Sequence, residues 1–130
     1  MALEVSQKRR VNPDSIELFE KEINRINALF IKHPTQKIAF YYYTIQTLLF
    51  EIKDDLWNTL HYCKEALQFF QENFSASPKA MIFNFLHKQI NIQIRLKQFD
   101  KADNSLRATL ELVPKGSSNW YIVNLSLIHI

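Results

Sequence analysis

The chain of 130 residues is long enough to bury one hydrophobic core, and 47% of it is hydrophobic, including ten Phe and five Tyr. This composition excludes an intrinsically disordered chain. A single Gly and four Pro exclude a fold of many tight turns or Gly-rich phosphate loops, and favour long helices with short connections. The formal charge of +3, from 16 basic and 13 acidic residues mixed along the chain, is weak evidence for nucleic acid, so we expect no such contact.

The cellular location can be predicted from three features. Cys63 is the single cysteine and can form no internal disulfide, which favours a reducing compartment. Lys8-Arg9-Arg10 is not followed by the apolar core of a secretory signal. The longest apolar run, residues 38–50, is too short to span a bilayer. We therefore expect a cytoplasmic protein that does not bind membranes.

The N-terminal part is predicted to contain a tail and one helix. We expect residues 1–12 to form a flexible tail. Asn12 can cap a helix that begins at Pro13, because proline suits the first helical position, and Pro34 ends this helix after its last turn. The apolar residues recur in steps of three and four and share one helix face: Ile16, Phe19, Ile23, Ile26 and Phe30.

Two further helices are predicted in the middle of the chain. The first of them begins at residue 35 or 36 and reaches about Lys53, and its aromatic residues at positions 40–43 point in every direction. Asp54-Asp55 breaks the pattern. The next helix precedes a loop at residues 72–77, and its apolar positions are Leu56, Leu60, Cys63, Ala66, Leu67, Phe70 and Phe74.

The segment from Leu86 to Pro114 predicts two antiparallel helices joined by a tight turn. Apolar residues in helical steps lie on both sides of a polar break at Lys97-Gln98. Ser77-Pro78 begins the first helix, Asp100 can cap the second, and Pro114 ends it. The apolar positions are Leu86, Ile90, Ile94 and Leu96, then Phe99, Ala102, Leu106, Leu110 and Val113. A sixth helix is expected to start at residue 117 or 118.

The sequence LKQFDKADNSLRATLELVP, residues 96–114, resembles a tetratricopeptide repeat. Ala102 stands at the small helix-crossing position, Leu106 and Thr109 at inward positions, and Pro114 at the closing proline. Residues 53–70 align with residues 96–113 at an offset of 43, which exceeds the usual ~34 residues. The family's large first-helix residue falls on Tyr43, Leu86 and Trp120 in three successive units.

The resemblance implies an all-α fold in which antiparallel helix pairs stack as a right-handed α-solenoid of about six helices over residues 13–124. The glycine that lets the family's paired helices approach closely is replaced by Thr47, Ile90 and Asn124. The helices must therefore sit further apart or cross differently, so a looser relative of the repeat is an alternative.

In this family the first helix of each unit lines a concave groove that holds an extended peptide. The positions that map onto this groove are Tyr41, Thr44, Leu48, Asn84, His87, Asn91 and Arg95. An asparagine can hydrogen-bond a peptide backbone through both ends of its amide, and an arginine can bind a carboxylate bidentately. The resemblance thus implies a non-catalytic scaffold for a protein or peptide partner. Two alternatives are a merely solvated helix face and the sensing region of a larger transcription regulator.

Catalytic and metal sites are not indicated by the sequence. His61 and Cys63 are two apart on a helix, so their side chains diverge. The metal-protease motif HExxH, paired cysteines and Gly-rich loops do not occur. Asp54-Asp55 is typical of a solvent-facing turn rather than of a general acid–base pair. We expect no enzymatic activity, no cofactor and no metal.

The last residues, 125–130, read LSLIHI. This string matches an in-frame translation of a transposase adaptor used in sequencing libraries. We therefore hypothesise that residues 125–130 are not native and that the chain is a fragment of a longer repeat protein. The apolar residues of the last helix would then lack a covering helix, so we expect self-association through Trp120, Val123 and Leu127.

Overall fold

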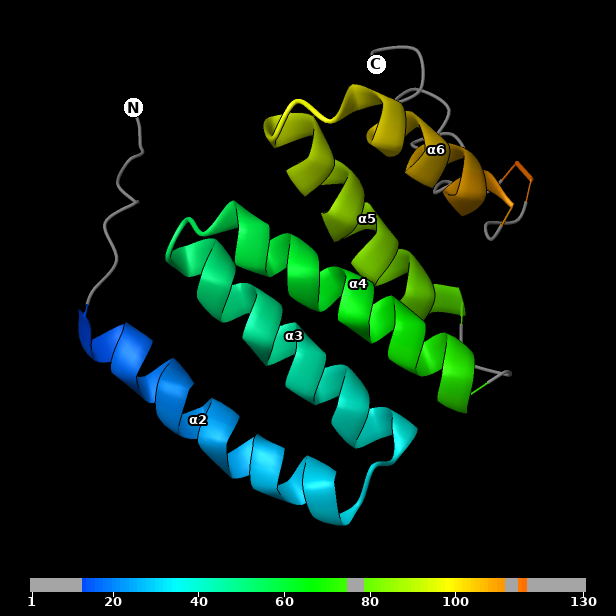
Figure 1. Cartoon of the computed structure of the whole chain (residues 1–130). Helices are drawn as coiled ribbons and strands as arrows, with labels where there is room; N and C mark the ends of the chain where they lie inside the picture. Colours follow the sequence, from blue (N-terminus) through cyan, green and yellow to red (C-terminus); the bar gives the residue numbers. More distant parts are fainter. Residues whose placement is uncertain (1–12, 75–78, 112–114, 117–130) are drawn as a thin grey trace. The chain divides into compact units, whose positions relative to one another are not determined.

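A computed structural model describes residues 13–74, 79–111 and 115–116. These residues form five helices and no strand, which confirms the all-α class for the described part of the chain (Figure 1). The helices are α2 (Pro13–Lys32), α3 (Gln36–Ile52), α4 (Leu56–Asn73), α5 (Lys79–Arg95) and α6 (Phe99–Leu110). The described residues thus contain five helices, where about six were expected for the chain. The predicted sixth helix, the tail at residues 1–12 and the segment 125–130 lie outside the described residues.

The chain divides into two compact units, Met1–Tyr62 and Cys63–Ile130, with the boundary inside α4. Within the described ranges, no helix combines the length and the apolarity that crossing a bilayer requires.

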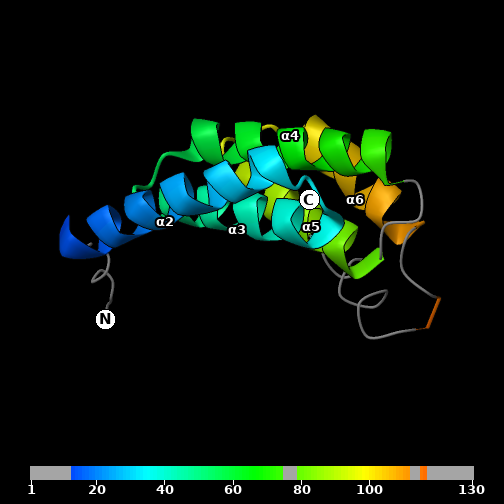
Figure 2. The same ribbon diagram turned by 90° about the horizontal axis from the view of Figure 1, so that it is seen from below.

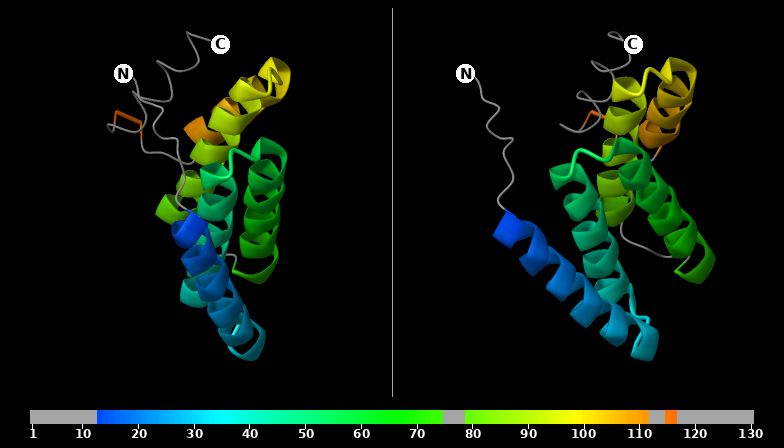
Figure 3. Two further views of the ribbon diagram at one scale, coloured as in Figure 1. Left: turned by 90° about the vertical axis from the view of Figure 1, so that its left-hand side faces the viewer. Right: turned by 60° about the vertical axis from the view of Figure 1, so that its left-hand side comes forward.

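The first unit is built on the antiparallel pair of α2 and α3 (Figures 1 and 3). Thr35 caps α3, because its hydroxyl oxygen accepts a hydrogen bond from the backbone N–H of Ile38 at 3.2 Å. Between the two helices the ring of Phe30 lies 5.0 Å from that of Tyr42 and 6.0 Å from that of Tyr43. Tyr43, onto which the family's large first-helix residue falls, is buried. These rings hold the hairpin end of α2 and α3 together.

The second unit is built on the antiparallel pair of α5 and α6 (Figures 1 and 2). Ile90 and Leu106 form its core, with three half-buried residues packed around them: Phe83, Ile94 and Leu110. Ala102 is fully buried, as the small helix-crossing position predicts. Farther along α5, the ring of Phe85 stacks on that of Phe70 from α4, with 6.1 Å between centroids.

Polar side chains also join α5 to α6. Gln89 donates to the hydroxyl of Ser105 at 3.0 Å, and that hydroxyl donates to the amide oxygen of Gln93 at 3.0 Å. Gln93 is 3% exposed. The hydrogen bond from Ser105 therefore provides a donor for the buried amide oxygen of Gln93.

Two predicted helix ends differ from those observed. The predicted loop at residues 72–77 begins later, because α4 continues through Asn73, whose side-chain amide donates to the carbonyl of Phe69 at 3.0 Å. At the other end of the second unit, α6 finishes at Leu110 rather than just before Pro114. Asp100 lies in the first turn of α6, but the residue at the cap position is Gln98, which makes no side-chain capping bond.

A candidate binding site between α2 and α3

An open hollow of about 290 Å³ lies between α2 and α3. Its lining is largely apolar and consists of Ser15, Leu18, Phe19, Glu22, Tyr41 and Ile45. Leu18 is 66% exposed and Tyr41 is 40% exposed, so solvent reaches both walls. An apolar hollow of this size with a few polar groups at its edge has the general character of a ligand site.

Helical spacing brings these residues together. Along α2 the lining residues follow one another in steps of three, one and three: Ser15, Leu18, Phe19 and Glu22. On α3, Tyr41 and Ile45 are four apart. Phe19 belongs to the apolar face that the sequence predicted for α2. Leu18 lies beside that face and remains exposed, so it supplies apolar surface that the helix pair itself does not bury.

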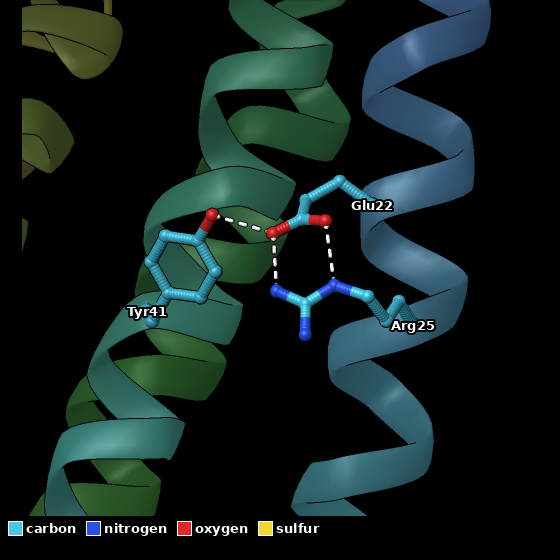
Figure 4. Close-up of polar contacts among 3 residues, drawn as sticks. All are labelled: Glu22, Arg25 and Tyr41. Atoms are coloured by element: carbon cyan, nitrogen blue, oxygen red, sulfur yellow. Dashed lines mark hydrogen bonds and ion pairs between the residues drawn. The ribbon is translucent and has the colours of Figure 1, made fainter.

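One edge of the hollow carries a three-residue polar cluster, which we call the Glu22 cluster: Glu22, Arg25 and Tyr41 (Figure 4). The guanidinium of Arg25 donates from Nε to Oε1 of Glu22 at 2.8 Å and from Nη2 to Oε2 at 2.6 Å. The hydroxyl of Tyr41 donates to the same Oε2 at 2.6 Å. The bidentate pair fixes the carboxylate in one orientation, and the tyrosine ties it to α3.

The hydrogen bonds of the Glu22 cluster shift the pKa values of its three side chains. The hydrogen bonds from Arg25, and next those from Tyr41, lower the pKa of Glu22 from 4.5 to about 2. The same carboxylate raises the pKa of Arg25 and, together with burial, that of Tyr41. Near neutral pH the cluster therefore holds one carboxylate anion, one guanidinium cation and one neutral phenol.

Arg25 keeps hydrogen-bonding capacity for a ligand. Its side chain is 58% exposed, and two of its N–H groups are used by Glu22. The Nη1 end of the guanidinium points away from the carboxylate in Figure 4. This end can donate to an acceptor at the edge of the hollow without breaking the Glu22 pair.

The predicted groove residues fall into two sets. Tyr41, Thr44 and Leu48 share a face of α3, and of these Tyr41 lines the hollow, whereas Thr44 and Leu48 do not. The hydroxyl oxygen of Thr44 is shielded from solvent and has no hydrogen-bond partner among the described residues.

The other four predicted residues recur along one face of α5, in the second unit. Asn84 is half-buried, whereas His87, Asn91 and Arg95 are exposed. The ring of His87 lies nearly parallel to that of Phe83, with 5.8 Å between centroids and 18° between planes. This face keeps the polar, solvent-reachable character that the sequence predicted, and its role as a groove remains a prediction.

Sequence reasoning missed most of the hollow. Leu18 and Ile45 were not assigned to a site, and Glu22 and Arg25 were not singled out. A local signal existed for the last two, because opposite charges three apart on a helix are neighbours. That Tyr41 of another helix completes the cluster depends on how α2 and α3 cross, and no local pattern encodes that crossing.

Histidine, cysteine and acidic residues form no group of three that could hold a metal ion in the ranges the structure describes. Cys63 is fully buried. Asp54 is exposed, and Asp55 caps α4 through a bond of 3.1 Å from the backbone N–H of Asn58 to its Oδ1. The prediction that this acidic pair forms a turn is confirmed.

The chain matches no family model, and no match was found among curated proteins or solved structures. The tetratricopeptide resemblance therefore stays a prediction that depends on the residues quoted for it.

Proposed function

We propose that this chain is a non-catalytic binding module that receives an apolar side chain of a peptide or protein partner in the hollow between α2 and α3. The observation that carries the proposal is the hollow itself, with exposed Leu18 on one wall and Tyr41 on the other. Burying that apolar surface under a partner would be favourable at roughly 25 cal/mol per Å².

The state of Glu22 supports a binding role over catalysis. A general base or acid works best when its pKa lies near the working pH. The pKa of Glu22 is held at about 2 by Arg25 and Tyr41, so the carboxylate stays ionised and hydrogen-bonded at neutral pH. Such a group orders the edge of a binding site rather than transferring protons.

The polar face of α5 is a second surface that we propose for partner contact, through the amides of Asn84 and Asn91, the ring of His87 and the guanidinium of Arg95. We also propose that the helix pairs belong to a tetratricopeptide-like α-solenoid. The support for this arrangement is the correspondence of two turns 43 residues apart, in which Asp54 and Lys97 both adopt positive φ.

A selection from a random peptide library displayed on phage, panned on the immobilised chain, tests the proposal. Binders should be enriched in one large apolar residue, and their affinity should fall about tenfold or more for Leu18→Gln, which removes apolar surface from the hollow. Ile31→Gln is the matched control, because Ile31 is also on α2, is 74% exposed and does not line the hollow.

Both substitutions lie at exposed positions, so each should keep the free energy of unfolding within about 0.5 kcal/mol of the parent. Affinity within about twofold of the parent is expected for Ile31→Gln. Equal losses for the two variants, or a library that yields no binder, would overturn the proposal.

A further inference from the structure

We infer that the partner segment is acidic: an apolar anchor residue enters the hollow between α2 and α3, and a neighbouring aspartate or glutamate of the same segment binds Arg25. This inference rests on the proposed function and adds to it the charge of the partner.

The first argument is the direction in which Arg25 can still donate. Its Nε and Nη2 groups hold Glu22, while the Nη1 end points away from that carboxylate (Figure 4). A guanidinium prefers carboxylate acceptors, because a charge-assisted hydrogen bond is stronger than a neutral one. An acidic residue beside the anchor would thus be held at the edge of the hollow.

Glu22 has little hydrogen-bond acceptor capacity left for a basic partner. Its carboxylate already accepts from two groups of Arg25 and from the hydroxyl of Tyr41. A lysine or arginine of a partner would have to compete with these bonds and would also meet the positive charge of Arg25. The cluster therefore offers a donor, at the Nη1 end of Arg25, rather than an open acceptor to a partner.

The third argument is the sign of the neighbouring charges. Lys21 is exposed and lies three residues after Leu18 and four before Arg25, on the same side of α2. Lys37 is exposed and lies one turn before Tyr41 on α3. Both add positive charge near the hollow. On the acidic side, exposed Glu17 lies four residues before Lys21, and Glu20 is engaged by Lys53 at 3.4 Å. An acidic segment at the edge of the hollow could pair with Lys21 and Lys37 as well as with Arg25.

The apolar lining of the hollow favours an apolar anchor. A space of about 290 Å³ lined by Leu18, Phe19 and Ile45 can receive a side chain of the size of leucine or phenylalanine. The occupant we propose is an internal segment of another protein, with one such residue flanked by carboxylates.

The test uses three short peptides whose ends are blocked by acetyl and amide groups, so that no terminal charge contributes. Each has a central leucine, flanked by aspartates in the first, asparagines in the second and lysines in the third. Each peptide is titrated into the full chain in a calorimeter. The aspartate peptide should bind about tenfold more tightly than the asparagine peptide, and the lysine peptide should bind most weakly. High salt should reduce this preference.

Variants locate the effect. Arg25→Gln should cost the aspartate peptide about tenfold in affinity, and Arg25→Lys, which keeps the charge but loses the fork of donors, should cost less. Arg107→Gln is the matched control, because Arg107 is also an exposed arginine, paired with Asp103 at 3.0 Å on α6. The affinity of the Arg107→Gln variant for the aspartate peptide should stay within about twofold of that of the parent chain.

The outcomes separate this inference from the proposed function. If the asparagine or lysine peptide binds as tightly as the aspartate peptide and Leu18→Gln weakens all of them, the proposed function stands and the acidic partner is refuted. Equal losses for Arg25→Gln and Arg107→Gln would also refute it. Absence of binding by all three peptides refutes the inference, whereas the phage selection decides the proposed function independently.

Discussion

Two turns of this chain, 43 residues apart, have the same backbone hydrogen bonds. At the end of α3, the N–H of Asp54 donates to the carbonyl of Glu51 at 3.0 Å, and the N–H of Asp55 donates to that of Phe50 at 2.8 Å. At the end of α5, Lys97 donates to Ile94 at 3.0 Å and Gln98 to Gln93 at 2.8 Å. Asp54 and Lys97 both adopt positive φ, at 57° and 63°. This is the left-handed ending that commonly closes a helix.

Burial repeats at the same offset. Three positions of α4 and their counterparts in α6 are all buried, in the pairs Thr59 and Ala102, Cys63 and Leu106, and Ala66 and Thr109. The correspondence has one exception, because Leu60 is buried whereas its counterpart Asp103 is not. The correspondence at this offset therefore includes the backbone bonds of the two turns and part of the buried face.

The contact across each turn uses different chemistry at equivalent positions. Phe50 and Tyr62 stack with 5.4 Å between ring centroids and 11° between planes. Their counterparts, Gln93 and Ser105, are joined by a hydrogen bond of 3.0 Å. The lesson is that the backbone geometry fixes which positions meet, while either an aromatic pair or a polar pair can fill them.

The largest effect is expected at the helix-crossing positions. Ala102→Leu should lower the free energy of unfolding by about 1–3 kcal/mol, because both Ala102 and its counterpart Thr59 are fully buried and leave no room for a larger side chain. Thr59→Leu should cost at least as much, since it also removes the hydroxyl bond to the carbonyl of Asp55. Urea unfolding measures both, and an unchanged midpoint for either variant would break the equivalence.

The polar contact between Gln93 and Ser105 can be tested with Ser105→Ala. This change leaves the buried amide of Gln93 without its donor and should cost about 1–2 kcal/mol. The aromatic pair of the first turn can be placed at these positions by combining Gln93→Phe with Ser105→Tyr. In a double-mutant cycle, the double variant should lose less free energy of unfolding than the sum of the losses of the two single variants. Strict additivity would show that the two positions do not form an equivalent contact.

A smaller effect is expected at the two left-handed residues. Lys97→Gly should raise the free energy of unfolding by about 0.5 kcal/mol, because glycine adopts positive φ without strain but loses more backbone entropy. Asp54→Gly should raise the free energy of unfolding by a smaller amount, since aspartate tolerates positive φ better than lysine does. Chemical unfolding of the two single variants compares them, and a larger gain at Asp54 would contradict this reasoning.

The smallest effect concerns the starts of α4 and α6, where the two turns differ. The side-chain and backbone N–H groups of Asn58 lower the pKa of Asp55 below 3.8, whereas Gln98 makes no side-chain capping bond. Because the folded-state pKa is depressed, the contribution of Asp55 to stability is present above pH 3.8 and is lost as the pH falls through the folded-state value. Unfolding of Asp55→Asn should therefore depend less on pH in this acidic range. An unchanged slope would count against the cap.

The helices could largely be predicted because their signals are local. Proline at position 13, threonine at position 35 and the polar breaks at Asp54-Asp55 and Lys97-Gln98 each act within one turn of the chain. The end of α6 was placed too late, since apolar spacing continues past Leu110 to Val113. Local spacing thus indicates that a helix exists more reliably than where it stops.

The candidate site could be predicted only in part. Tyr41 was selected because it maps onto a groove position of the family it resembles, and it lines the hollow between α2 and α3. Leu18 was not singled out, because its place in the hollow arises only where α2 passes α3. The pairing of Glu22 with Tyr41 joins residues 19 positions apart and depends on the same crossing.

The most direct test of the account is a map of where a selected peptide binds. Amide chemical shifts of the isotope-labelled chain would be followed while a phage-selected peptide is added. The account predicts the largest changes at Leu18, Phe19, Glu22, Tyr41 and Ile45, with smaller changes on the polar face of α5. Changes confined to that face, at Asn84, His87, Asn91 and Arg95, or spread evenly over the chain, would contradict the hollow as the binding site.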